Sequence, residues 1–234
     1  MERKILGILG GMGTIATAHF FKVLAERVRA EKDQDYPRII IDNNPNNPDR
    51  TAAITGRGEN PVDEIVISLK NLESAGAQVI AMPCISAHYY YDEIAGSTAV
   101  PLINMIEETY KVYSEKISGK IVGLLATTGT VISGNFLRFF PEEVMVFPDE
   151  YSQENLVMEA IYGEKGIKIG EVAYPKGLLI QAAAELINKG AEAIIAGCTE
   201  VSVILKNEDL PVYYLDPIII LAESSILKTG YQLK

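Results

Sequence analysis

The sequence predicts an α/β protein made of two similar doubly wound parallel-sheet domains related by a pseudo-twofold axis. Three observations support this prediction. Short apolar runs alternate with amphipathic stretches, three segments recur in the same order, and the two cysteines end matching runs. A chain of 234 residues is long enough for two small domains with buried cores.

The recurring segments divide the chain into two related halves. Residues 4–14 read KILGILGGMGT, and residues 120–130 read KIVGLLATTGT. Residues 76–84 read GAQVIAMPC, and residues 190–198 read GAEAIIAGC. A weaker pair, VPLI and LPVY, follows each of these at 100 and 210. Three matches in the same order at nearly equal spacing indicate an internal duplication.

Each half contains four apolar runs that predict strands. They lie at 5–9, 38–41, 78–82 and 101–103 in the first half, and at 121–125, 144–147, 193–196 and 212–215 in the second. Because these runs are almost continuously apolar, they are typical of parallel strands covered on both faces.

The helices between the strands carry end signals. Asn60 and Pro61 are suited to the N-cap and first position of a helix that passes Leu69 and stops at Gly76. Gly190 ends a helix over 178–188 in the same way. We expect the helix after Pro217 to pack back on the first half. The predicted domains are therefore 1–103 with 217–234, and 104–216.

Composition excludes several classes of partner. Lys and Arg total 21 against 31 for Asp and Glu, and the net charge of −10 disfavours nucleic-acid binding. No apolar run is long enough to span a membrane. Two cysteines do not form a disulfide framework, which indicates a reducing cytoplasm. The sequence therefore predicts a cytoplasmic protein with a small-molecule ligand.

Cys84 and Cys198 are the candidate reactive groups. Both follow predicted strands at the sheet edge where α/β proteins bind ligands, so we expect the thiols to face each other across a cleft. One thiolate can then remove a proton from one face of a carbon while the other thiol delivers a proton to the opposite face. Buried apolar cysteines, or a metal ligand pair with His88, are the alternatives. Gly11-x-Gly13-x-x-Ala16 with Asp42 also fits a dinucleotide fingerprint.

Five motifs resemble the aspartate/glutamate racemase superfamily, and they are most similar to its cofactor-independent aspartate racemases. They are GGMG at 10–13, NNPNNPDRT at 43–51, PCISAH at 83–88, ATTGT at 126–130 and GCTE at 197–200. The resemblance spans nearly the whole chain. It implies a homodimer that interconverts L- and D-aspartate without pyridoxal phosphate or another cofactor.

The same resemblance assigns roles to individual residues. Cys84 and Cys198 are the acid/base pair, Arg50 holds a substrate carboxylate, and Lys165 supplies a second cation. Hydroxyls of Ser86 and Thr199 bind the α-carboxylate with nearby N–H groups. The complete set of expected substrate-binding residues is Met12, Asp49, Arg50, Thr51, Ser86, Ala87, Lys165 and Thr199.

One departure from the family pattern concerns the substrate. The family reads PCNTAH where this chain reads PCISAH, so Ile85 replaces an amide side chain. Two other functions remain open: another isomerisation or decarboxylation of a dicarboxylate by the same cysteines, or non-catalytic binding of an acidic amino acid or nucleotide. Beside the cysteines, Glu200 is expected to orient a neighbour or weaken the acidity of Cys198. His88 is expected to have a structural role.

Overall fold

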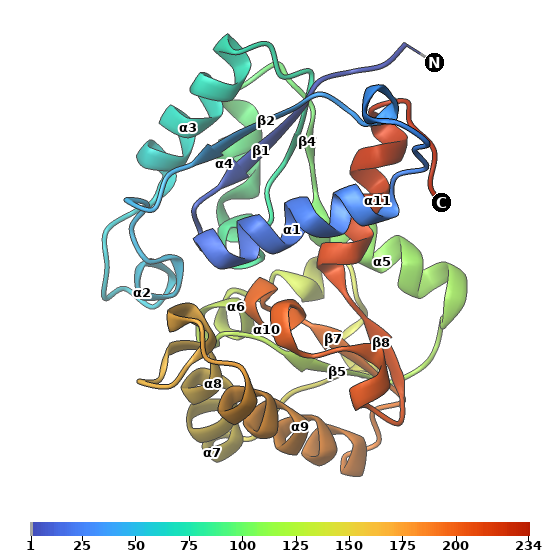
Figure 1. Cartoon of the computed structure of the whole chain (residues 1–234). Coiled ribbons are helices and arrows are strands. Elements are labelled where there is room, and N and C mark those ends of the chain that lie inside the picture. The colour runs from blue at the N-terminus through green and yellow to red at the C-terminus, as the bar shows by residue number, and fades with distance from the viewer. Residues whose placement is uncertain (1) are drawn as a thin grey trace.

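The computed structural model describes residues 2–234 and contains two four-stranded parallel sheets, one in each half of the chain. In Figure 1 the first sheet lies in the upper part of the molecule and the second in the lower part. The first sheet contains β1 (Leu6–Gly10), β2 (Ile39–Asn43), β3 (Val79–Ala81) and β4 (Leu102–Ile103). The second contains β5 (Val122–Leu125), β6 (Met145–Val146), β7 (Ala193–Ala196) and β8 (Tyr213–Leu215).

Helices follow the strands in both halves. The first half contains α1 (Thr14–Arg27), α2 (Arg50–Ile54), α3 (Val62–Ser74) and α4 (Tyr91–Gly96), and α5 (Met105–Lys116) leads to the second half. The second half contains α6 (Thr128–Ser133), α7 (Glu150–Ser152), α8 (Glu159–Tyr162), α9 (Ala173–Asn188) and α10 (Thr199–Ile204), and α11 (Pro217–Lys228) follows. The predicted α/β architecture and all eight predicted strands are confirmed.

The two sheets repeat the same strand order, β2-β1-β3-β4 and β6-β5-β7-β8. Their register also repeats: Leu6 pairs with Val79, and Val122 pairs with Ala193. A glycine occupies the next position of β1 and of β5, Gly7 and Gly123. A Cβ at either one would lie 2.9 Å from a neighbouring Cβ. The duplicated sequence therefore preserves a close approach of chain segments as well as a strand order.

Helix ends agree with the expected caps, with one difference. The side chain of Asn60 accepts a hydrogen bond from Val62 N–H at 3.0 Å, and Gly76 has a φ of +94° just after α3. In contrast, α9 begins at Ala173, five residues before the predicted start at 178. Pro175 lies in its first turn, where the missing N–H group costs no helical hydrogen bond.

Apolar packing joins the halves away from the strand ends. One buried cluster contains Leu6 and Ile8 of the first sheet, Leu124 and Ile195 of the second, and residues of α1, α5 and α11. The chain passes between the sheets twice, through α5 and through the turn from β8 to α11. Helix α11 packs against α1, α5 and β3. Within residues 2–234, no helix has the length and apolar character needed to cross a membrane.

Candidate active site

The two cysteines occupy equivalent positions at the carboxyl ends of β3 and β7. Cys84 lies in the turn after β3, where its N–H donates to the Met82 carbonyl at 2.8 Å. Cys198 is the N-cap residue of α10, directly after β7. Both are free thiols, and both are buried. The fold therefore holds each thiol on a short connection between a central strand and a helix.

Both cysteines line the same cavity between the halves. The cavity has about 10 Å³ of free volume, enough for at most one water. A hollow of about 250 Å³ at the N-terminus of α1 shares Lys168 and Glu200 with it. A substrate therefore needs the cleft to open from this closed arrangement. The lining residues are Met12, Arg50, Cys84, Ile85, Ser86, Thr127, Tyr162, Lys168, Cys198, Thr199 and Glu200.

A charged chain of contacts ends at Cys198. Its Sγ donates to Glu200 Oε2 at 3.0 Å, and Lys168 Nζ lies 3.2 Å from Glu200 Oε1. Burial raises the pKa of the Cys198 thiol, and the Glu200 carboxylate raises it further. Burial also opposes ionisation of Glu200, but the charge of Lys168 and the hydrogen bonds from Cys198 and Lys168 together lower the carboxyl pKa. Cys198 is thus held as a thiol, in the direction expected from sequence for Glu200.

Arg50 lies on the side of Cys84. Its Nη1 donates to the carbonyls of Pro48 and Asn47 at 2.9 and 3.3 Å, and its Nη2 donates to the Met12 carbonyl at 3.1 Å. Its buried Nε has no partner among the described residues. Burial lowers the pKa of this guanidinium, but negative charge on Cys84 and Asp49 outweighs that effect and raises it. Arg50 is therefore a buried, fixed cation with unused donors.

Hydroxyl groups connect the halves beside the cysteines. Thr51 donates to Thr127 at 3.2 Å, and Ser86 lies 3.1 Å from Thr130. Tyr162, at the end of α8, donates to Asp49 Oδ2 at 3.0 Å. These contacts cross from the first half to the second and hold the cleft closed.

The structure separates the expected substrate-binding residues into two groups. Met12, Arg50, Ser86 and Thr199 line the cavity with both cysteines. The other expected residues do not line it. Asp49 caps α2 through Ala52 N–H at 2.7 Å, Thr51 bonds to Thr127, and Ala87 is fully buried.

Lys165 differs most from its expected place. Its side chain is exposed and does not line the cavity, whereas Lys168, three residues later, does. Both lysines lie in one glycine-bounded segment, so spacing alone could not choose between them. The Lys168 ammonium also lies 5.0 Å from the centre of the Tyr162 ring. Sequence reasoning missed two cavity residues, Tyr162 and Lys168. The available signal was their position, because both lie within a few residues of Lys165 in the glycine-containing segment.

His88 has the structural role expected for it. Met105 N–H donates to Nε2 at 3.0 Å, so the ring proton is on Nδ1, which lies 2.8 Å from the Cys84 carbonyl. Both ring nitrogens are therefore used by the backbone, and the ring joins the Cys84 turn to the start of α5. Within residues 2–234, no group of three or more His, Cys, Asp or Glu side chains is placed to hold a metal ion.

We expect His88 to destabilise the fold in mild acid. Burial lowers its pKa from 6.5 to about 4, so the unfolded chain binds more protons between these values. Stability should fall by about 3 kcal/mol as the pH drops from 6.5 to 4. Urea unfolding should show a shallower pH dependence in His88→Gln than in the wild type. An unchanged slope would contradict this assignment. Burial also lowers the pKa of the half-buried His19 to about 4, so His19→Gln should flatten the dependence as well, and the double variant should show the shallowest slope.

The glycine motif has a packing role rather than a nucleotide role. Gly11 has a φ of +90°, and a Cβ there would lie 2.2 Å from the Asn44 carbonyl oxygen. Asp42, the expected ribose ligand, accepts a hydrogen bond from Asn71 at 2.9 Å. The backbone at Gly11 is thus covered by the chain itself, in the place where a pyrophosphate would have to approach.

Comparisons with known proteins agree with this geometry. The family model for Asp/Glu/hydantoin racemases matches residues 9–224. The chain belongs to this family. It is therefore an isomerase, and its relatives indicate an amino-acid racemase.

Three similar proteins illustrate the relationship. Picrophilus torridus aspartate racemase is 32% identical, with a TM-score of 0.83 over 99% of this chain and 96% of that one. The broad specificity amino-acid racemase RacX of Bacillus subtilis (strain 168) is 27% identical, covering 95% of this chain and 96% of its own. Glutamate racemase of Francisella tularensis, solved with D-glutamate, shares the fold at 16% identity and a TM-score of 0.63. The match covers 97% of this chain and 82% of that one.

Proposed function

We propose that this enzyme interconverts L- and D-aspartate by two-base proton transfer between Cys84 and Cys198, without pyridoxal phosphate or another cofactor. The observation that carries the proposal is the pair of buried thiols, from equivalent strand ends of the two halves, lining one cavity. Similarity to the Picrophilus aspartate racemase supports the choice of substrate.

The reaction begins with Cys198 as a thiol, because burial and Glu200 raise its pKa. A Cys84 thiolate takes the α-hydrogen of one enantiomer, and the electrons of the broken C–H bond move into the α-carboxylate. Cys198 then gives its proton to the opposite face of Cα. The thiolate and thiol exchange roles for the reverse reaction. Charge on the substrate carboxylate is stabilised by Arg50 and by the hydroxyls of Ser86 and Thr199.

The acidic side chain of the substrate needs a second cation. Lys168 lines both the cavity and the hollow at the N-terminus of α1. A helix N-terminus favours negative charge, and α1 has no acidic residue in its first turn. We therefore assign the β-carboxylate to this hollow in the opened cleft.

Ile85 gives the cavity an apolar group where the family has a polar one. Its side chain is 1% exposed and packs in the apolar cluster that joins the halves. Ser86 keeps the hydroxyl beside Cys84. The broad specificity of RacX makes other amino acids sensible competitors in the assay.

Proton NMR in heavy water with L-aspartate, combined with chiral chromatography, tests the proposal. We expect loss of the Cα–H signal and growth of D-aspartate without added pyridoxal phosphate. A change in product connectivity would favour another isomerase or a decarboxylase. Binding without exchange would favour a non-catalytic protein. Glutamate and other amino acids should be run in parallel to define the substrate.

Replacing each lysine in turn with glutamine tests which one contacts the substrate. We expect Lys168→Gln to lower kcat/KM about 100-fold, because it removes a charged contact and leaves Glu200 unpaired. Lys165→Gln is the matched control, from the same segment, and should stay within about twofold because its side chain is solvated. Equal losses in both variants, or a larger loss in Lys165→Gln, would contradict the assignment.

Glu200→Gln should change the pH dependence of catalysis. Removing the carboxylate removes one of the two main effects that raise the pKa of Cys198. For the enantiomer whose α-hydrogen faces Cys198, the rising limb of kcat/KM against pH should move to lower pH. The limb for the other enantiomer should shift less. An unchanged profile for both enantiomers would show that Glu200 does not tune this thiol.

We also propose a cytoplasmic homodimer, as the resemblance implies. Two free buried thiols suit a reducing compartment. The edge strand β2 carries Ile41 at 41% exposure beside Phe21 at 42% and Tyr36 at 38%, an apolar surface suited to a second copy. Sedimentation equilibrium of the wild type and of Ile41→Lys tests the dimer and this surface.

A further inference from the structure

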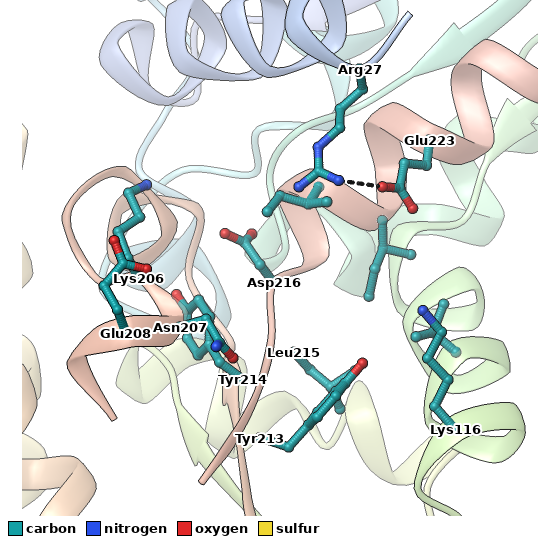
Figure 2. Close-up of a pocket in the computed structure, with 13 residues that line it drawn as sticks. Arg27, Lys116, Lys206, Asn207, Glu208, Tyr213, Tyr214, Leu215, Asp216 and Glu223 are labelled. Atoms are coloured by element: carbon teal, nitrogen blue, oxygen red, sulfur yellow. Dashed lines mark hydrogen bonds and ion pairs between the residues drawn. The ribbon is translucent and has the colours of Figure 1, made fainter. Parts of the chain in front are cut away.

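A second cavity lies at the other end of α1 from the cysteines. The active-site cavity touches Met12, just before α1, whereas this one touches Arg27, its last residue. A helix of 14 residues separates the two sites by about 20 Å. We call the second cavity, lined by residues of α1, α5, β8 and α11, the junction pocket; its volume is about 350 Å³. Figure 2 shows its residues converging from these elements.

Both passages of the chain between the halves contribute to the junction pocket. Val112 and Lys116 come from α5, Leu215 ends β8, and Asp216 lies between β8 and α11. The pocket is thus built by the segments that connect the two sheets.

One wall carries a buried acid without an ion-pair partner. Asp216 is 5% exposed, and one of its carboxylate oxygens caps α11 by accepting Ile218 N–H at 2.9 Å. Within residues 2–234, no lysine, arginine or histidine nitrogen lies within 4.0 Å of its carboxylate. Burial raises the pKa of this carboxyl group despite the nearby charge of Lys206. A ligand ammonium would supply the missing positive charge.

The wall across from Asp216 carries a lysine and an aromatic side chain. In Figure 2 the Lys116 ammonium lies across the pocket from Asp216, near the Tyr213 hydroxyl. Lys116 forms no ion pair with any described residue, whereas Arg27 is paired with Glu223 at 3.0 Å. The free ammonium suits a ligand carboxylate.

The remaining lining is partly polar, from Lys206, Asn207 and Glu208, and partly apolar. Val112, Leu215, Ile219 and Ile220 line the pocket with the Tyr213 ring. A volume of about 350 Å³ exceeds what the backbone atoms of one amino acid fill, so a side chain fits beside them.

We propose that the junction pocket binds an α-amino acid with an apolar side chain. Its ammonium contacts Asp216, its carboxylate contacts Lys116, and its side chain packs on the apolar lining. This binding is separate from the reaction at the cysteines, and its test does not depend on turnover.

Calorimetry with L-leucine and two fragments of it tests the two charged contacts of the proposal. 3-Methylbutylamine lacks the carboxylate, and 4-methylpentanoate lacks the ammonium. We expect one leucine per junction pocket and at least about tenfold weaker binding of each fragment. Absence of a leucine signal in the wild type, or equal binding of either fragment, would overturn the proposal.

Variants locate the binding. Asp216→Asn keeps a good N-cap for α11 but removes the negative charge, so leucine affinity should fall at least about tenfold. Lys116→Gln should weaken leucine but not 3-methylbutylamine. Glu115→Gln, on the same helix and outside the pocket, is the control and should bind normally. Leucine binding that is lost in Arg50→Gln and kept in Asp216→Asn would place the ligand in the catalytic cleft and overturn the proposal.

Discussion

Replacing either Cys84 or Cys198 with serine is expected to stop inversion while leaving the α-hydrogen of one enantiomer exchangeable. Serine is a far weaker acid than cysteine, so loss of one acid/base group should lower racemisation by about 10³-fold. The remaining cysteine still faces one side of Cα. It can remove a hydrogen and return deuterium to the same face, which exchanges the atom without inverting the centre.

The two variants should therefore have opposite preferences in heavy water. Cys84→Ser should exchange only the enantiomer whose α-hydrogen faces Cys198, and Cys198→Ser should exchange only the other one. Proton NMR of pure L- and D-aspartate measures all four combinations. Wild-type racemisation by either variant, or the same enantiomer preference in both, would rule out the two-base reaction.

Arg50→Lys is expected to lower kcat/KM about 100-fold. A guanidinium has five N–H donors, and the carbonyls of Met12, Asn47 and Pro48 accept only some of them. The remaining donors, including the buried Nε, suit a bidentate carboxylate. A lysine ammonium in this place would use its donors on the carbonyls and keep none in that planar arrangement.

The control for this variant is Arg57→Lys. Arg57 is exposed, and its Nε donates to Thr55 at 3.1 Å, just beyond α2. Its activity should stay within about twofold of the wild type. Thermal unfolding distinguishes a damaged fold from a damaged site. An Arg50→Lys variant with normal kcat/KM would remove Arg50 from the carboxylate-binding role.

Sequence predicted the fold well because local and long-range signals agreed. Apolar strands that are covered on both faces leave a clear pattern, and the duplicated segments carry the same strand order in both sheets. The start of α9 was wrong by several residues, because a proline in a first turn resembles a break. Boundaries depend on which of several acceptable caps the tertiary packing selects.

The site was predictable where a residue follows a strand and less so where it lies on a loop. Cys84 and Cys198 are placed by the sheets, so their common cavity followed from the repeat. Lys165 and Lys168 occupy one irregular segment, and the ion pair with the buried Glu200 decides which one faces the cleft. Such a choice depends on a distant partner, Glu200, which local spacing does not reveal. Tyr162 was missed for the same reason, since Asp49 and Thr51 hold its hydroxyl from the other half.

The return of α11 to the first half sets an order for folding during synthesis. The strands and helices of the second sheet are contiguous and can assemble as soon as β8 leaves the ribosome. The first half also needs residues 217–234, since α11 packs against α1 and β3 and Leu233 bridges to Val28. Nascent chains that stall before Pro217 would expose the apolar faces of α1 and α5, which makes the N-terminal half the last to become resistant to proteases.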